Sequence, residues 1–300
     1  MRFTIHQNSR NGGRPSNQDR VAYSYSKQSL LMVLADGMGG YLHGDVAAQL
    51  AVKMLTDAFQ RKAQPLLDDV QDFLLTEINK IQDAIHQLAH NQGLEETPKT
   101  TLVVAVLQNN RLVCAHIGDS RLYHFRQHQC IFTTEDHSVV QALLKQGTLA
   151  PNDVAAHPDR NKVYNCLGGD IPPTIDISPT RRLHSDDTIM LCSDGLWSYL
   201  SADRMLEILD SGRGMPHFIN SMLDIAEQLG GAQGDNLSAI GVQWEDILDQ
   251  DLTLSGLTTA LDQARTIIQP LPDESLSELS HDDIERAIAE INVAIQRSKR

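Results

Sequence analysis

Short apolar runs that end at an aspartate restrict the fold of this chain more than any other feature of its sequence. The clearest run extends from Leu30 to Ala35, follows polar residues and ends at Asp36. A continuous apolar run of this length is typical of a strand that is buried on both faces. Similar runs end near Asp119 and at Asp194. The sequence therefore predicts several core strands whose ends carry carboxylates.

Helical patterns follow the first of these strands. Apolar residues recur at helical spacing over residues 47–59 and, after a break at Pro65, over residues 66–88. A short third helix is predicted over residues 139–145, inside a loop-rich region that extends from about residue 136 to 170. Two adjacent amphipathic helices of this kind are expected to form an antiparallel pair on one face of a sheet.

A hairpin and further strands complete the predicted core. Asn109 and Asn110 tolerate positive φ angles and separate two apolar runs, residues 101–107 and 111–117, so a tight turn is predicted between them. The remaining predicted strands cover residues 122–125, 188–192 and 239–242. Strands in two groups, with helix pairs outside them, indicate an α+β fold built of stacked layers.

The character of the chain changes after Trp244. Two helical patterns remain, over residues 254–268 and 284–295, and a Pro-containing, Ser-rich link separates them. We therefore predict one domain over residues 1–245 and a separate helical extension over residues 246–300.

The composition argues against several classes of function. A formal net charge of -14 argues against nucleic-acid binding, and no Lys/Arg run is present that would hold an anionic membrane surface. Apolar runs fall far short of a membrane span. The cysteines are far apart and form no CxxC pair, so neither a zinc knuckle nor a disulfide framework is indicated. Because the N-terminus turns polar before a signal peptide could form, a cytoplasmic location is expected.

The acidic residues at strand ends suggest a metal site. A carboxylate at a strand end is held by rigid backbone, and carboxylate oxygens without Cys or His among them select hard cations such as Mg²⁺ or Mn²⁺. Asp235 lies in a Gly-Asp-Asn turn, and Asp19 follows Arg14 by five residues. Because metal ions and a guanidinium both attract phosphate, a phosphate-containing substrate is predicted.

In this order and setting, the segments resemble the metal-dependent Ser/Thr protein phosphatases of the PP2C (PPM) family, bacterial type. The likeness covers about residues 4–244 and leaves the C-terminal extension outside. A single Asp-Gly pair is a worthless signal, but seven ordered matches make coincidence improbable. The matching segments are Arg14-xx-Asn17-Gln18-Asp19, Asp36-Gly37-Met38-Gly39-Gly40, Thr100-Thr101, Gly118-Asp119-Ser120-Arg121, Asp136-His137-Ser138, Ser193-Asp194-Gly195 and Gly234-Asp235-Asn236.

The resemblance implies a four-layer αββα sandwich, in which helix pairs flank two antiparallel sheets and two Mg²⁺ or Mn²⁺ ions, with a possible third, lie at one end. Residues 136–170 correspond to the variable flap beside this cleft. The implied roles are Asp36 as the bridge between two ions, the Gly37 carbonyl as a ligand of one ion, Asp194 and Asp235 as ligands of the other, Asp119 with Asp194 as a weaker third site, Asp19 as the holder of metal-bound water, Arg14 as the phosphate-binding residue, and Gln18 and Asn236 as neighbours of the metal ligands.

The implied reaction is hydrolysis of phosphoserine and phosphothreonine in proteins. A hydroxide shared between two metal ions would attack phosphorus in line, and no protein nucleophile is required. Phosphoproteins are the expected substrates, with a cognate Ser/Thr kinase as a possible further partner. Two alternatives stay open at this point: a pseudophosphatase that binds phosphoproteins as a scaffold, and an enzyme that hydrolyses small phosphate esters.

Two positions depart from the family pattern. Most members have Glu where this chain has Gln18, which adds no charge to the metal site. Many bacterial members have His where this chain has Tyr41, so His43 is the candidate general acid, with a solvated or helix-capping side chain as the alternative. His137 and His116 are expected to be structural, the first in a loop whose side chains satisfy backbone groups and the second in the core.

Overall fold

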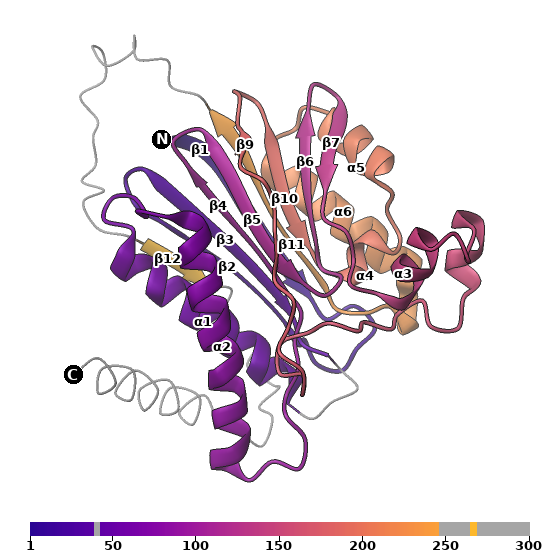
Figure 1. Ribbon diagram of the computed structural model, residues 1–300. Coiled ribbons are helices and arrows are strands. Elements are labelled where there is room, and N and C mark those ends of the chain that lie inside the picture. Colours follow the sequence, from indigo (N-terminus) through magenta and orange to yellow (C-terminus); the bar gives the residue numbers. More distant parts are fainter. Residues whose placement is uncertain (39–42, 246–264, 269–300) are drawn as a thin grey trace, which may run out of the picture.

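The computed structural model describes residues 1–38, 43–245 and 265–268, and Figure 1 shows their arrangement. The elements, in chain order, are β1 (Arg2–Arg10), β2 (Asp19–Tyr25), β3 (Ser29–Asp36), α1 (Gly44–Lys62), α2 (Val70–Gln92), β4 (Leu102–Gln108), β5 (Arg111–Ile117), β6 (Arg121–Arg126), β7 (Gln129–Thr133), α3 (Val139–Lys145), η1 (Pro151–Ala156), β8 (Asp176–Ile177), β9 (Arg181–Arg182), β10 (Thr188–Cys192), α4 (Asp194–Trp197), α5 (Ala202–Leu209), α6 (Met215–Gly230), η2 (Gly231–Gln233), β11 (Leu237–Glu245) and β12 (Arg265–Ile268).

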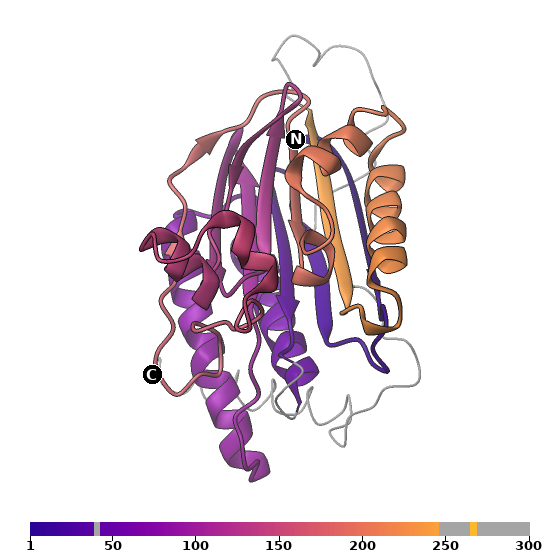
Figure 2. The same cartoon turned by 90° about the vertical axis from the view of Figure 1, so that its right-hand side faces the viewer.

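Two antiparallel sheets lie face to face. The five-stranded sheet has the order β1-β11-β10-β6-β7, and the seven-stranded sheet has the order β12-β2-β3-β4-β5-β8, with β9 also paired to β5. Helices α1 and α2 cover the outer face of the larger sheet, while α4, α5 and α6 cover the smaller one (Figures 1 and 2). The predicted four-layer αββα sandwich is confirmed.

Strand β3 shows why the central strands are apolar throughout. Leu31 and Val33 pack in the core beneath α1 and α2, whereas the alternating residues Leu30, Met32 and Leu34 pack between the two sheets. Because successive side chains of a strand point to opposite faces, a strand with a core on each side needs apolar residues at every position. The prediction of a strand buried on both faces is confirmed.

Local signals set most element boundaries. Asn109 and Asn110 both have φ of 52° and form the turn of the β4–β5 hairpin, as predicted. Helix α3 has the predicted bounds, and the side chain of Ser138 caps its N-terminus through the backbone N–H of Gln141. Helix α2 begins later than predicted because the Asp69 side chain accepts hydrogen bonds from two N–H groups of its first turn.

The C-terminal extension departs from the predicted helical pattern at residues 265–268. This segment is strand β12, which pairs with β2 so that Arg265 lies opposite Tyr25 and Ile268 opposite Ala22. The predicted helix over 254–268 is therefore wrong at its C-terminal end. A Thr-Ile-Ile run favours an extended backbone, and β2 would otherwise present an unpaired edge. The rest of the predicted extension, including the pattern over 284–295, lies outside the described residues.

Within residues 1–38, 43–245 and 265–268, no helix is long and apolar enough to cross a membrane. Four cysteines are free thiols in the described structure, and Cys114 and Cys192 are buried; the other two are Cys130 and Cys166.

Candidate active site

Five aspartates meet at one end of the sandwich. Asp19 begins β2 and lies opposite Asp36 at the end of β3. Asp119 follows β5, Asp194 begins α4 directly after β10, and Asp235 precedes β11. These strand ends come from both sheets, so the topology brings together residues that are more than 200 positions apart in sequence. The predicted cluster of carboxylates is present in the structure.

A cavity of about 570 Å³ opens at this end of the sheets. Four of the five aspartates line it, while the side chain of Asp19 is buried next to it. The residues that line the cavity are Arg14, Pro15, Ser16, Gln18, Asp36, Gly37, Met38, Thr101, Asp119, Asn161, Val163, Asp194, Asp235 and Asn236. Most of these residues are polar or glycine, as expected for a site that binds ions and phosphate rather than an apolar ligand.

The carboxylates disfavour one another's charge. Burial raises the pKa of Asp36 and of Asp194 well above the ordinary value, and the neighbouring aspartates raise both further. Burial also raises the pKa of Asp19 to about 6 and that of Asp119 to about 7. Crowded acids of this kind are stabilised when positive charge lies among them. The electrostatics thus favour a cation.

The donor atoms fit a hard divalent cation. The buried Oδ1 of Asp19 has no hydrogen-bond partner among the described residues, while its Oδ2 accepts a hydrogen bond from Ser193 Oγ at 2.8 Å. The surrounding ligand atoms are carboxylate, amide and carbonyl oxygens, and the described residues that line the cavity include neither thiolate nor imidazole. Mg²⁺ and Mn²⁺ prefer such ligands.

The loop that carries Arg14 is fastened by Asn236. The Asn236 side chain accepts a hydrogen bond from the Gln18 backbone N–H and donates to the carbonyls of Asn11 and Ser16. Arg14 then reaches Asp235 with two hydrogen bonds, of 3.0 and 2.8 Å, in the planar geometry that guanidinium also adopts with phosphate. The predicted neighbour role of Asn236 thus has a structural cause: it fixes the loop on which Arg14 and Gln18 lie.

Gly37 allows two segments to meet beside the cavity. Its N–H donates to the Gln18 carbonyl at 3.2 Å. A Cβ at this position would lie 2.5 Å from the Gly44 carbonyl and 2.8 Å from the Gln18 oxygen. A side chain would therefore force apart β3, the start of α1 and the Gln18 loop.

Comparison with known proteins decides the family. The family model described as protein phosphatase 2C matches residues 7–236. This chain belongs to the protein phosphatase 2C family. The resemblance seen in the sequence is therefore confirmed, and the match spans all five aspartates of this phosphatase together with Arg14.

Relatives and solved structures agree with this assignment. The chain is 31% identical over 252 residues to the serine/threonine phosphatase stp of Listeria monocytogenes, which covers 84% of this chain and 93% of the relative. The structure of the S. agalactiae serine/threonine phosphatase superposes with a TM-score of 0.75 at 27% identity, covering 81% of this chain and 100% of that one. The catalytic domain of the phosphatase PstP, in complex with two manganese ions, superposes with a TM-score of 0.66 at 28% identity, covering 81% and 99%.

His43 does not lie on the cavity wall of this 2C phosphatase. It is the N-cap residue directly before α1, with φ of 65°, and its backbone carbonyl accepts the first hydrogen bonds of the helix while its side chain makes no capping hydrogen bond. Its Nδ1 is buried and makes no hydrogen bond within the described residues. Residues 39–42 lie outside them, so the role of His43 as general acid stays a prediction.

Sequence patterns missed the residues that hold the aspartates in place. Ser193 donates to Asp19, and Trp197 Nε1 donates to the Asp119 carbonyl at 2.9 Å. The Arg121 guanidinium stacks on the Trp197 ring at 3.5 Å from its centre. One signal was available: Trp197 follows Asp194 by three residues, which places both on neighbouring positions of one helical turn.

Proposed function

We propose that this 2C phosphatase hydrolyses phosphoserine and phosphothreonine in proteins with two Mg²⁺ or Mn²⁺ ions at the aspartate cluster. The observation that carries the proposal is the convergence of five aspartates, four with raised pKa, on one polar cavity beside Arg14. Asp36, the Gly37 carbonyl, Asp194 and Asp235 would hold the two ions. The PstP catalytic domain in complex with two manganese ions supports this assignment.

Different residues of the chain would have different roles in phosphate hydrolysis. When bound, a pair of such ions lowers the pKa of water and supplies the nucleophile for in-line displacement. Asp19, with its free Oδ1 and its Oδ2 held by Ser193, is placed to orient water by accepting its hydrogen bonds. Arg14 would bind two phosphate oxygens and neutralise the charge that develops on them. Asp119 with Asp194 would provide the weaker third site.

The function is tested by turnover of a phosphothreonine peptide and of p-nitrophenyl phosphate in the presence of Mn²⁺. We expect activity with both substrates and its loss on addition of EDTA. Binding of the phosphopeptide without turnover at any Mn²⁺ concentration would favour the scaffold instead. Turnover of the small ester alone would favour an enzyme for small phosphate esters. A cognate kinase and a cytoplasmic location remain predictions.

Arg14→Ala is expected to raise KM for the phosphopeptide by about tenfold or more, because a charge-assisted bidentate contact with phosphate is lost. Since Arg14 is paired with Asp235, its removal should leave the Mn²⁺ half-saturation concentration unchanged or lower it. Steady-state kinetics at several Mn²⁺ concentrations measure both quantities. Arg111→Ala, on the hairpin at the opposite end of the sheet, serves as the control. A large rise in the Mn²⁺ half-saturation concentration of Arg14→Ala would contradict the phosphate role, because it would show that Arg14 supports metal binding.

Gln18→Glu is expected to lower the Mn²⁺ concentration needed for half-maximal activity. Gln18 lines the cavity, and its backbone is fixed by hydrogen bonds to Asn236 and Gly37. A carboxylate there would add a negative charge at nearly constant volume, and charge count tunes divalent affinity. Gln28→Glu, on the exposed surface, is the matched control. If both variants give the wild-type value in a Mn²⁺ titration, position 18 does not act on the metal site.

A further inference from the structure

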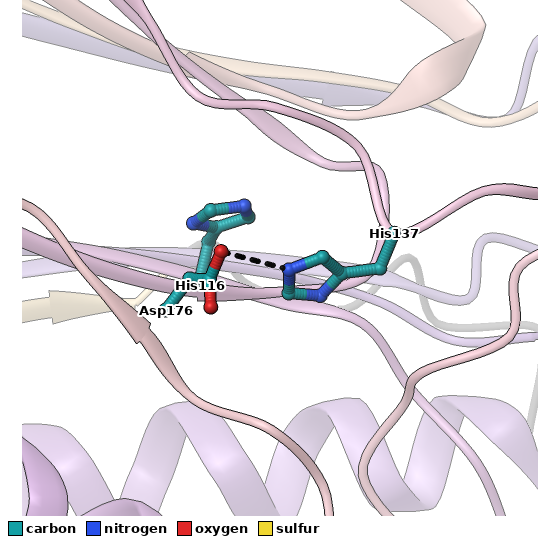
Figure 3. Close-up of side chains that lie close together, drawn as sticks. All are labelled: His116, His137 and Asp176. Atoms are coloured by element: carbon teal, nitrogen blue, oxygen red, sulfur yellow. Dashed lines mark ion pairs between the residues drawn. The ribbon is translucent and has the colours of Figure 1, made fainter. Parts of the chain in front are cut away.

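A second group of potential metal ligands lies behind the Asp119 turn. His116 on β5, His137 after β7 and Asp176 on β8 bring a nitrogen or oxygen ligand atom each within 4.8 Å of the others (Figure 3). The two imidazole rings are stacked, with their centres 4.7 Å apart. Whether such a group binds a metal depends on which ring nitrogens carry protons, because only an unprotonated nitrogen can be a ligand.

The hydrogen bonds of His137 fix its protonation. Its Nδ1 accepts from the Gly118 backbone N–H at 3.2 Å and faces Asn165 Nδ2 at 2.6 Å. The orientation of the Asn165 amide is set in turn by Thr174, whose N–H donates to Oδ1 and whose carbonyl accepts from Nδ2. Both groups at His137 Nδ1 are therefore donors, so Nδ1 carries no proton. The proton lies on Nε2, which points to the Asp176 carboxylate at 3.3 Å (Figure 3).

His116 is fixed in the same way. Its Nε2 lies 2.7 Å from the backbone carbonyl oxygen of Glu135, which can only accept, so Nε2 is the protonated nitrogen. Burial lowers the pKa of His116, and the neighbouring His137 lowers it further, which favours the neutral ring. Because His137 Nε2 carries a proton directed at Asp176, it cannot be a metal ligand. The group of His116, His137 and Asp176 therefore lacks the second imidazole ligand that a metal site would need.

We propose that His137 is a positioning residue for the Asp119 carboxylate, held in the required tautomer by Asp176 and Asn165. The inference rests on the proposed function, in which Asp119 holds a metal ion. His137 bonds Gly118 twice: its Nδ1 accepts the Gly118 N–H, and its own backbone N–H donates to the Gly118 carbonyl at 2.9 Å.

The turn before β6 is thus held from two sides. His137 fastens Gly118, which has φ of 99°, while Trp197 Nε1 donates to the carbonyl of Asp119. Asn165 and Asp176 belong to the region at and after the predicted flap, so the tautomer of His137 connects that region to the Asp119 carboxylate. If Asn165 or Asp176 moved away from His137, the turn would lose its support on the Gly118 side.

The first test reads the tautomer directly. Long-range ¹H–¹⁵N correlation spectra of the Mg²⁺-loaded full chain are expected to show a neutral His137 with its proton on Nε2, with the signals assigned by their loss in His137→Asn. A proton on Nδ1 of His137 would overturn the proposal.

The second test is a double-mutant cycle on Mn²⁺ binding, measured by calorimetry. His137→Gln keeps a polar group near Nε2 but removes the acceptor at Nδ1, whereas His137→Asn places an oxygen near Nδ1. We expect His137→Gln to weaken the weakest Mn²⁺ site by about tenfold and His137→Asn to weaken it less. The loss should disappear in an Asp119→Asn background. An equal loss with and without Asp119 would show that His137 acts elsewhere.

A milder variant guards against misfolding. Asp176 is half-exposed, so Asp176→Ala removes the partner of His137 without opening the core, and the exposed Asp170→Ala is its control. We expect a weaker Mn²⁺ site in the first variant alone, again only when Asp119 is present. Because calorimetry needs no turnover, an inactive wild-type protein would reject the proposed function and still leave the coupling between His137 and Asp119 measurable.

Discussion

Asp36→Ala is expected to reduce phosphatase activity by about 100-fold or more at saturating Mn²⁺. Asp36 ends β3 opposite Asp19, lines the cavity and is one of the residues that would hold the two ions. Its loss removes charge stabilisation from the step that carries the chemistry. Retention of more than a tenth of wild-type turnover, a difference of only about 1.4 kcal/mol in barrier height, would contradict the site assignment.

The fold of Asp36→Ala should be intact, which separates lost chemistry from lost structure. Burial and the neighbouring aspartates raise the pKa of Asp36 in the folded state. Above the ordinary aspartate pKa of about 4, this carboxyl therefore lowers the free energy of unfolding of the metal-free protein. In EDTA at neutral pH the variant should therefore melt at or above the wild-type temperature. Asp83→Ala, on the exposed face of α2, is the control and should change neither activity nor melting. A much lower melting temperature for Asp36→Ala would make its inactivity uninformative.

Sequence patterns predicted the sandwich well because its central elements carry local signals. The run from Leu30 to Ala35 is apolar at every position since it has a core on each face, and the turn at Asn109-Asn110 is set by positive φ angles that few other residues adopt. Strand β12, in contrast, carries no local signal strong enough to predict it. Its conformation depends on the free edge of β2, a partner more than 200 residues away, which helical spacing in the tail does not reveal.

In the candidate site, too, some residues could be predicted from sequence and others could not. Asp36, Asp119 and Asp194 are visible in sequence because an apolar run ends at or just before each of them, whereas Asp19 begins its strand, Asp235 precedes its strand, and both are recognised from the motifs around them. The contacts that orient them are not visible. Ser193 meets Asp19 across 174 positions, and His137 meets Gly118 across 19. Which residues meet in this way depends on how the strands pair in the folded chain. A sequence motif can therefore predict a metal ligand but not the residues that hold the ligand in place.

Asp187→Asn is expected to lower the free energy of unfolding by about 3 kcal/mol at neutral pH, with activity retained in the molecules that stay folded. Asp187 is fully buried and accepts hydrogen bonds from Arg126, His124 Nε2 and the backbone N–H of His184. An amide keeps the shape of the carboxylate but leaves the guanidinium without its charge partner and the buried His124 without a full acceptor.

The adjacent Asp186 offers a matched control. It is exposed, and its side chain accepts a long hydrogen bond, of 3.5 Å, from Gln243. Its φ of 67° is one that Asn adopts readily, so Asp186→Asn should change stability by no more than about 0.5 kcal/mol. Urea unfolding followed by circular dichroism measures both variants.

The pH dependence gives the sign of the Asp187 effect. Burial opposes ionisation of Asp187, but the hydrogen bonds from Arg126 and His124 outweigh it and hold its pKa well below the ordinary value. A group with a lowered pKa in the folded state contributes stability above the unfolded pKa of about 4, and that contribution is lost as the pH falls toward the folded pKa. The gap between wild type and Asp187→Asn should therefore be constant from about pH 5 to 7 and shrink on acidification below about pH 4. A gap that stays constant into acid would mean that the lost stability comes from packing around the side chain rather than from its charge.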